Sequence, residues 1–308
     1  MRIREDLDVA FVSAKGPVRP ENQDDILLYE PLEDLVLESR GRLFALADGM
    51  GGLLGGAEAS RAALRGFLAG FLAAMDEAES QGTNRPDLAP ALRHAFGCAS
   101  KAVAEEARRK PQFADMGTTL TAFVLRGSEV VGIHIGDSRC LLLSENGDRW
   151  LSKLHTTPGQ DHILTRALGV GGQKEVADDF SVELHTGDSL LLMSDGFWNS
   201  VSIEEIRTSV LGVGAEEATQ ELVQLALGRD GQDNASLLAV TRLCETRRDL
   251  SSREIEETEV SAPPWEGVTS TLPGLLERRW PLLLALIGIL FLLIALWIQG
   301  LGSGLDIR

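Results

Sequence analysis

The chain has few of the residues that define several common protein classes. Its 308 residues include only three cysteines, Cys98, Cys140 and Cys244, which lie far apart and form no CxxC pair. This spacing argues against a disulfide framework or a zinc site, and it favours reduced thiols in a cytosolic domain. The five histidines form neither an HxH nor an HExxH pair, so the sequence contains no recognisable histidine metal motif.

Positive charge is also scarce. Twenty-nine Lys and Arg residues face 46 Asp and Glu residues, which gives a formal net charge of -17. A protein of this charge is unsuited to binding phosphate backbones, so we expect no nucleic-acid partner. Part of the acidic excess would be neutralised if some carboxylates hold divalent cations.

Residues 1–243 have the pattern of one α+β domain. Apolar runs typical of strands cover residues 7–14, 25–30, 42–48, 119–127, 129–137, 140–146, 188–195 and 236–243. Ala- and Leu-rich runs at helical spacing cover residues 57–79, 87–110, 203–212 and 215–228. Short turn signals across residues 126–148 predict an antiparallel meander there. Grouped strands and grouped helices favour sheets inside and helices outside.

The C-terminal part differs in composition. Residues 244–275 are charged and contain Ser, Thr and Pro without a clear period, which is typical of a flexible linker. The uncharged run from Trp280 to Ile298 would span ~28 Å as a helix, close to the ~30 Å core of a bilayer. We therefore expect a transmembrane helix over residues 276–299, followed by a short tail, residues 300–308. A buried helix of the soluble domain is the alternative, but no face of this segment is polar.

The charges beside this segment predict its orientation. Arg278 and Arg279 precede it, whereas the tail carries one Arg and one Asp, so the positive-inside rule leaves the preceding chain in the cytoplasm. The N-terminal sequence MRIREDLDVAF is charged and lacks an apolar core, unlike a secretory signal. The expected location is the cell membrane, with a single span and a cytoplasmic domain.

Four aspartates lie where an apolar run meets a turn rich in Gly, Ser or Asn. They are Asp48 in LFALADGMGG, Asp137 in VVGIHIGDSR, Asp195 in SLLLMSDGFW and Asp233 in QDNASLLAV. In antiparallel sheets the end of one strand lies beside the start of the next, so all four carboxylates can reach one rim. Such a rim repels itself unless it holds a cation, and oxygen ligands favour magnesium or manganese.

Other interpretations of the first motif fit less well. A dinucleotide-binding loop would need a third glycine where Leu54 stands, and Asp48 would repel a pyrophosphate. A tight turn capped by an acid remains the structural alternative for that motif taken alone. Near the N-terminus, Arg19 in VRPENQDD offers a planar fork suited to two phosphate oxygens, although a surface arginine is the alternative.

The ordered set RPENQD, ADGMGG, GTTLTA, GDSR, LTRALG, LLMSDGFW and DNAS resembles the metal-dependent serine/threonine protein phosphatases of type 2C, in their bacterial form. The resemblance covers residues 10–243 and implies an αββα four-layer sandwich, with two antiparallel sheets between helix pairs. It implies hydrolysis of phosphoserine or phosphothreonine by water activated at two Mn²⁺ or Mg²⁺ ions, with a third ion possible.

The same resemblance implies roles for individual residues. Asp48 and the Gly49 carbonyl would bind the ions, with Asp195 and Asp233 completing the pair, and Asp137 would serve a third ion. Arg19 would grip the phosphate, with Gln23 and Asp24 just outside the metal ligands. A phosphorylated protein and a cognate Ser/Thr kinase are the partners implied.

The sequence departs from the family pattern at three points. Gln23 stands where many relatives have Glu, and Met50 stands where animal enzymes have a proposed proton-donating His. The segment at residues 150–163 is shorter than the usual flap, and His155 fits the family's Asp-His-Ser element poorly. A catalytically inactive scaffold or binding module, and an enzyme for small phosphorylated metabolites, are the alternative functions.

Overall fold

The computed structural model describes residues 2–3, 6–50, 52–169, 175–229 and 232–243. All of them belong to the first of two units into which the chain divides, Met1–Glu257. The predicted linker, membrane helix and tail (residues 244–308) lie outside the described residues. Within the part that is described, no helix has both the length and the apolar character needed to cross a membrane.

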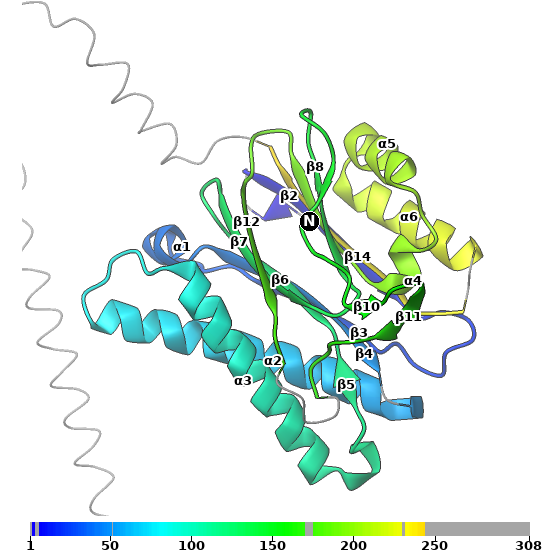
Figure 1. Ribbon diagram of the computed structural model, residues 1–308. Helices are drawn as coiled ribbons and strands as arrows, with labels where there is room; N and C mark the ends of the chain where they lie inside the picture. Colours follow the sequence, from blue (N-terminus) through cyan, green and yellow to red (C-terminus); the bar gives the residue numbers. More distant parts are fainter. Residues whose placement is uncertain (1, 4–5, 51, 170–174, 230–231, 244–308) are drawn as a thin grey trace, which may run out of the picture. The chain divides into compact units, whose positions relative to one another are not determined.

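Two six-stranded antiparallel sheets form the centre of the domain (Figure 1). The first, called here the β14 sheet, has the order β1 (Arg2–Ile3), β2 (Leu7–Ala14), β14 (Ala235–Arg242), β13 (Ser189–Met193), β8 (Arg139–Leu143) and β9 (Arg149–Trp150). The second, called the β4 sheet, has the order β12 (Asp178–Glu183), β7 (Glu129–Ile135), β6 (Leu120–Arg126), β4 (Arg42–Met50) and β3 (Asp24–Tyr29), with β5 (Gly117–Thr118) paired to β4. A separate small hairpin joins β10 (Thr156–Thr157) and β11 (Gln160–Leu164).

Helices cover the outer face of each sheet (Figure 1). On the β4 sheet lie α2 (Gly52–Ser80) and α3 (Leu88–Arg109), and on the β14 sheet lie α5 (Ile203–Val213) and α6 (Ala215–Arg229). The shorter helices are α1 (Asp34–Arg40), the 3₁₀ turn η1 (Pro111–Phe113) and α4 (Asp195–Trp198). The predicted αββα four-layer sandwich is therefore confirmed for the described domain.

Three buried clusters hold these layers together. One fills the space between the sheets, where the rings of Phe44 and Phe123 lie 5.1 Å apart. The other two lie between each sheet and its helices. Gly66 and Gly70 let α2 approach α3 closely, because a Cβ at either position would lie within 3 Å of atoms of α3. Small residues on facing helices thus allow the close packing of α2 against α3 within that outer layer.

The predicted meander is wrong at one connection. The turns at residues 126–129 and 144–148 do join antiparallel neighbours, β6 to β7 and β8 to β9. The GDSR segment instead carries the chain from β7 in the β4 sheet to β8 in the β14 sheet. Gly136, with φ of 112°, makes this crossing at a backbone conformation that favours glycine. Asp137 consequently lies at the junction of the two sheets.

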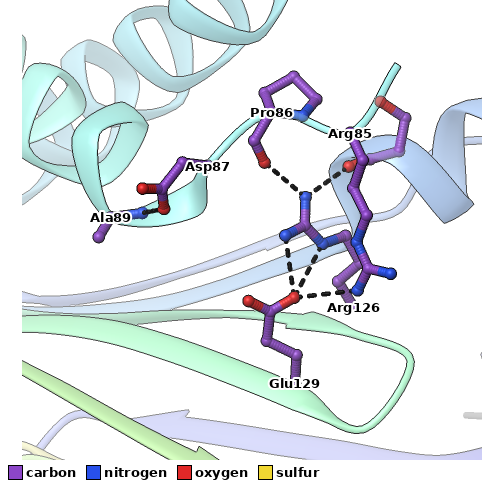
Figure 2. Close-up of polar contacts among 7 residues, drawn as sticks. Arg85, Pro86, Asp87, Ala89, Arg126 and Glu129 are labelled. Carbon is purple, nitrogen blue, oxygen red and sulfur yellow. Dashed lines mark hydrogen bonds and ion pairs between the residues drawn. The ribbon is translucent and has the colours of Figure 1, made fainter. Parts of the chain in front are cut away.

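The last residue of β6, the buried Arg126, forms hydrogen bonds with three segments of the chain (Figure 2). The Arg126 guanidinium donates to the carbonyl oxygens of Ser39 (2.9 Å) and Pro86 (2.7 Å) and to the Glu129 carboxylate (2.9 Å). Arg85 reaches the same carboxylate at 3.0 Å. The network joins the end of α1 and the α2–α3 loop to the β6–β7 hairpin.

Replacing Arg126 by Met should lower the free energy of unfolding by about 2 kcal/mol, because two carbonyl groups lose their charged donor and one of them is buried. Urea denaturation measures the change. The matched control is Arg85→Met, whose half-exposed ion pair should contribute less than about 1 kcal/mol. Equal losses in the two variants would contradict a special role for Arg126.

Candidate functional site

The predicted aspartates meet at one end of the sandwich, and both sheets contribute. Asp48 lies near the end of β4, and Asp24 is its direct partner at the start of β3. Asp195 follows β13 as the first residue of α4, and Asp233 lies two residues before β14. Because β13 and β14 are antiparallel, with Met193 opposite Leu237, those two aspartates share an end of the sheet. Asp137 comes from the crossing between the sheets.

Burial and mutual repulsion raise the pKa values of four of these carboxyls. The pKa of Asp48 lies well above its ordinary value, first because of desolvation and then because of Asp24, Asp195 and the other aspartates. Desolvation with the same neighbours raises the pKa of Asp137 to about 7. Desolvation also raises the pKa of Asp24 to about 6 and that of Asp195 in the same direction. The cluster therefore resists holding its full negative charge.

Each carboxyl has its own contacts. Asp233 forms an ion pair of 2.5 Å with Arg19, whose side chain remains 42% exposed. Asp48 and Asp195 are within hydrogen-bonding contact of each other. Asp24, on the β4 sheet, accepts a 2.6 Å bond from Ser236 on β14, and it also bonds Ser194 at the end of β13. Asp24 thus joins the two sheets beneath the cluster.

The backbone around Asp48 is fixed from both sides. Its amide donates to the Thr119 hydroxyl, and its carbonyl oxygen accepts from the Thr118 hydroxyl and the Thr119 amide, each at 2.9 Å. Gly49 lies against Gly56 on the second turn of α2, and a Cβ on Gly49 would lie 2.0 Å from the Gly56 carbonyl oxygen. Gly49 and Gly56 therefore allow a close approach of strand and helix.

Asn234 is a site residue to which the sequence analysis gave no role. Its side-chain oxygen accepts from the Gln23 amide at 2.9 Å, and its side-chain nitrogen donates to the Glu21 carbonyl at 3.3 Å. The buried Gln23 in turn accepts from the Gly49 amide at 3.1 Å. Asn234 therefore fastens the loop that carries Arg19. Its position directly after Asp233 in the DNAS motif is the sequence feature that could have identified Asn234 as a site residue.

The turn that carries Asp137 is held by a histidine. The Gly136 amide donates to Nδ1 of His155 at 3.1 Å, and the His155 amide donates to the Gly136 carbonyl oxygen at 2.9 Å. The Nε2 atom of His155 lies 3.3 Å from Asp178. Although it fits the family element poorly by sequence, His155 supports this turn. Met50, half-buried and paired with Gly117, offers no proton donor at its position.

The donor set suits hard divalent cations. Five aspartates lie close together, the pKa values of four of them are raised, and the charge of Arg19 interacts with Asp233, Asp48 and Asp195. Cations would relieve that repulsion, and carboxylate oxygens are the ligands that Mg²⁺ and Mn²⁺ prefer. Among the residues that the structure describes, no three Asp, Glu, His or Cys side chains already have a coordinating arrangement. Asp233 faces Arg19, so cation binding by Asp233 requires its oxygens to turn, whereas Asp24 can keep its serine contacts outside the ligand set.

The raised pKa of Asp137 predicts how stability depends on pH in metal-free buffer. Its folded pKa of about 7 exceeds the ordinary value of 3.8, so its stabilising protonated form is lost as pH rises through 7. Because the unfolded chain loses this proton near pH 3.8 and the folded chain near pH 7, Asp137→Asn should gain stability relative to the native chain as pH rises from 3.8 to about 7, and the difference should level off above that. His134 and His155 have lowered pKa values, which give the opposite slope in both proteins, so the difference between the two proteins is the quantity to measure. Urea midpoints in EDTA report it, and a difference that shrinks with pH would contradict the assignment.

The comparisons with known proteins agree with this geometry. The family model described as protein phosphatase 2C matches residues 21–229. "Serine/threonine protein phosphatase PstP" of Mycobacterium tuberculosis (strain ATCC 25618 / H37Rv) is 32% identical over 249 residues, which is 75% of this chain but only 44% of that protein. "Serine/threonine phosphatase stp" of Listeria welshimeri is 30% identical over 265 residues, 78% of this chain and 98% of that one.

A solved structure shows the same fold. It is the catalytic domain of serine threonine protein phosphatase PstP in complex with two manganese ions, with a TM-score of 0.62 and 31% identity. The match covers 78% of this chain and 99% of that one. The resemblance drawn from the motifs is confirmed: the chain belongs to the protein phosphatase 2C family.

Proposed function

We propose that this chain is an active metal-dependent protein serine/threonine phosphatase. The observation that carries the proposal is the cluster of acidic side chains at the junction of two sheets, with Arg19 at its edge, in a chain of this family. All four aspartates singled out from the sequence lie in the cluster. A phosphorylated protein is the substrate class, and a cognate Ser/Thr kinase is the partner that this activity implies.

Two Mn²⁺ or Mg²⁺ ions are the proposed cofactors, as in the manganese complex of the PstP catalytic domain. Asp48 and the Gly49 carbonyl, with Asp195 and Asp233, would hold the pair, and Asp137 would serve a third ion. Bound ions would supply an activated water and would offset the charge of the phosphoryl group. Gln23 and Asp24 would act from outside the ligand set, by holding the strands in place.

Arg19 is the proposed phosphate-binding residue. Its guanidinium is about half exposed and lies at the edge of the acidic cluster, where Asp233 orients it. A planar guanidinium can donate two parallel hydrogen bonds to phosphate oxygens. Met50 cannot donate a proton, so leaving-group protonation needs another group.

The proposed location is a membrane, through the predicted helix at residues 276–299. The support is the uncharged run with Trp280 and Trp297 at its two ends. The arginines before this run favour a cytoplasmic catalytic domain. Anchoring would raise the effective concentration of the enzyme toward membrane-bound phosphoproteins.

Asp48→Asn and Asp195→Asn should each reduce hydrolysis of a phosphothreonine peptide by more than about 100-fold, because each removes an anionic ligand. Both variants should remain folded, since removing a charge from the cluster relieves repulsion. The measurements are phosphate release with and without Mn²⁺, and circular dichroism.

The matched control is Asp76→Asn, an exposed carboxylate on α2 that should leave activity unchanged. Near-native activity in either cluster variant would contradict the metal assignment. A native chain that is inactive with Mn²⁺ would favour the scaffold function, and a preference for small phosphate esters over peptides would favour a metabolite phosphatase.

Removing residues 276–308 should release a soluble enzyme with the peptide activity of the full chain, because the cluster lies wholly within residues 1–243. Fractionation of cells that express each form, followed by assay, tests this. A full chain found only in the soluble fraction would contradict anchoring. Loss of activity on truncation would show that the segment contributes to the catalytic fold.

A further inference from the structure

Arg139, the first residue of β8, is held by aromatic rings. Its guanidinium carbon lies 3.4 Å from the centroid of the Trp150 ring and 5.1 Å from that of Trp198. Its Nε atom is buried without a hydrogen-bond partner, and no ion pair of Arg139 occurs among the described residues. The two indole faces are therefore the groups in the described chain that hold this cation.

Burial alone lowers the pKa of Arg139, to about 10. The guanidinium consequently stays charged at neutral pH, and the cation–π attraction persists. Both indoles also pack against the cluster between the β14 sheet and its helices, which limits their movement. A charged group between two partly fixed rings restrains the position of each ring.

Trp198 connects this arrangement to the acidic cluster. It ends α4, the single helical turn that begins with Asp195. Its indole Nε1 donates a 2.9 Å hydrogen bond to the backbone carbonyl oxygen of Asp137. One side chain thus joins the turn after β7 to the helix after β13, two segments far apart in the sequence.

We propose that Arg139, Trp150 and Trp198 form a cation–π clamp that sets the position of Asp137 relative to Asp195. The three are positioning residues, since they act through the backbone of Asp137 and through α4. The proposal rests on the proposed function, because its consequence concerns how well the acidic cluster binds divalent cations. Loosening the clamp lets the two carboxylates separate, and this weakens cation binding most where Asp137 takes part.

The direct test is calorimetric titration of the full chain with Mn²⁺ in place of an activity assay. Trp198→Phe keeps a ring and removes the indole N–H, and we expect about tenfold weaker binding of at least one ion, as for other groups that orient metal ligands. Arg139→Met should weaken binding in the same direction. Arg139→Lys keeps the charge but loses the planar stack, and it should fall between Arg139→Met and the native chain.

A double-mutant cycle separates the clamp from simple packing. If Arg139 acts through Trp198, the variant with both changes should bind Mn²⁺ no more weakly than Trp198→Phe alone. Additive losses would overturn the proposal. The matched control is Arg207→Met, because Arg207 on α5 bonds Asp148 and the Ser144 carbonyl in the turn between β8 and β9, away from Arg139. That control should lose stability without a change in Mn²⁺ affinity.

The outcomes distinguish this inference from the proposed function. A native chain that binds no Mn²⁺ would overturn the proposed function. A native chain that binds Mn²⁺, together with Trp198→Phe and Arg139→Met variants of equal affinity, would overturn the clamp alone. If Trp198→Phe does not fold, the affinity of Arg139→Met decides, and a native value there overturns the clamp.

Discussion

The arrangement of this domain depends on placing several like charges together where water is largely excluded. Five aspartates from five chain segments lie close together, and desolvation is the largest cause for each of the four whose pKa is raised. Such a cluster lowers the stability of the bare protein. The fold holds it by drawing the backbones around it together, through the threonines behind Asp48, the Asn234 side chain and the contact of Gly49 with Gly56. The contacts near the cluster keep repelling side chains in place, whereas the Arg126 network at the far end of β6 adds stability to the fold.

Much of the fold was open to prediction because its signals are local. The strands with apolar runs and the four long helices follow from residues that are neighbours in sequence, and β2 falls on residues 7–14 as expected. Strand β12 was missed because its sequence, DDFSVE, contains only two apolar residues, too few for a clear apolar–polar alternation. As an edge strand it buries one face, so Phe180 and Val182 suffice. Helix α1 was missed because its seven residues make only two turns, which is too few to show a helical repeat of apolar residues.

The length of the turn at Gly136 does not predict that the chain passes there from one sheet to the other. A short link can join neighbouring strands ~5 Å apart or strands in stacked sheets ~10 Å apart, and the sequence does not distinguish them. The aspartates were predictable because each stands beside a turn residue. Their supporting groups were not, since a serine such as Ser236 or an indole such as Trp198 becomes a partner only when distant strands meet. The family resemblance supplied residue roles, but it named none of these supports.

The bond between Arg19 and Asp233 has a consequence for the order of events at the site. One nitrogen of the Arg19 guanidinium bonds Asp233, and that nitrogen cannot give the same hydrogen to an incoming phosphoryl group. A cation that takes the Asp233 oxygen frees that donor, so loading of the cluster and capture of the phosphoryl group favour each other. By reciprocity, a retained product phosphate would raise the affinity of the cluster for the cation. The Arg19–Asp233 ion pair would thus be broken when the ion binds and would form again when the ion leaves, while Asn234 keeps the loop in place.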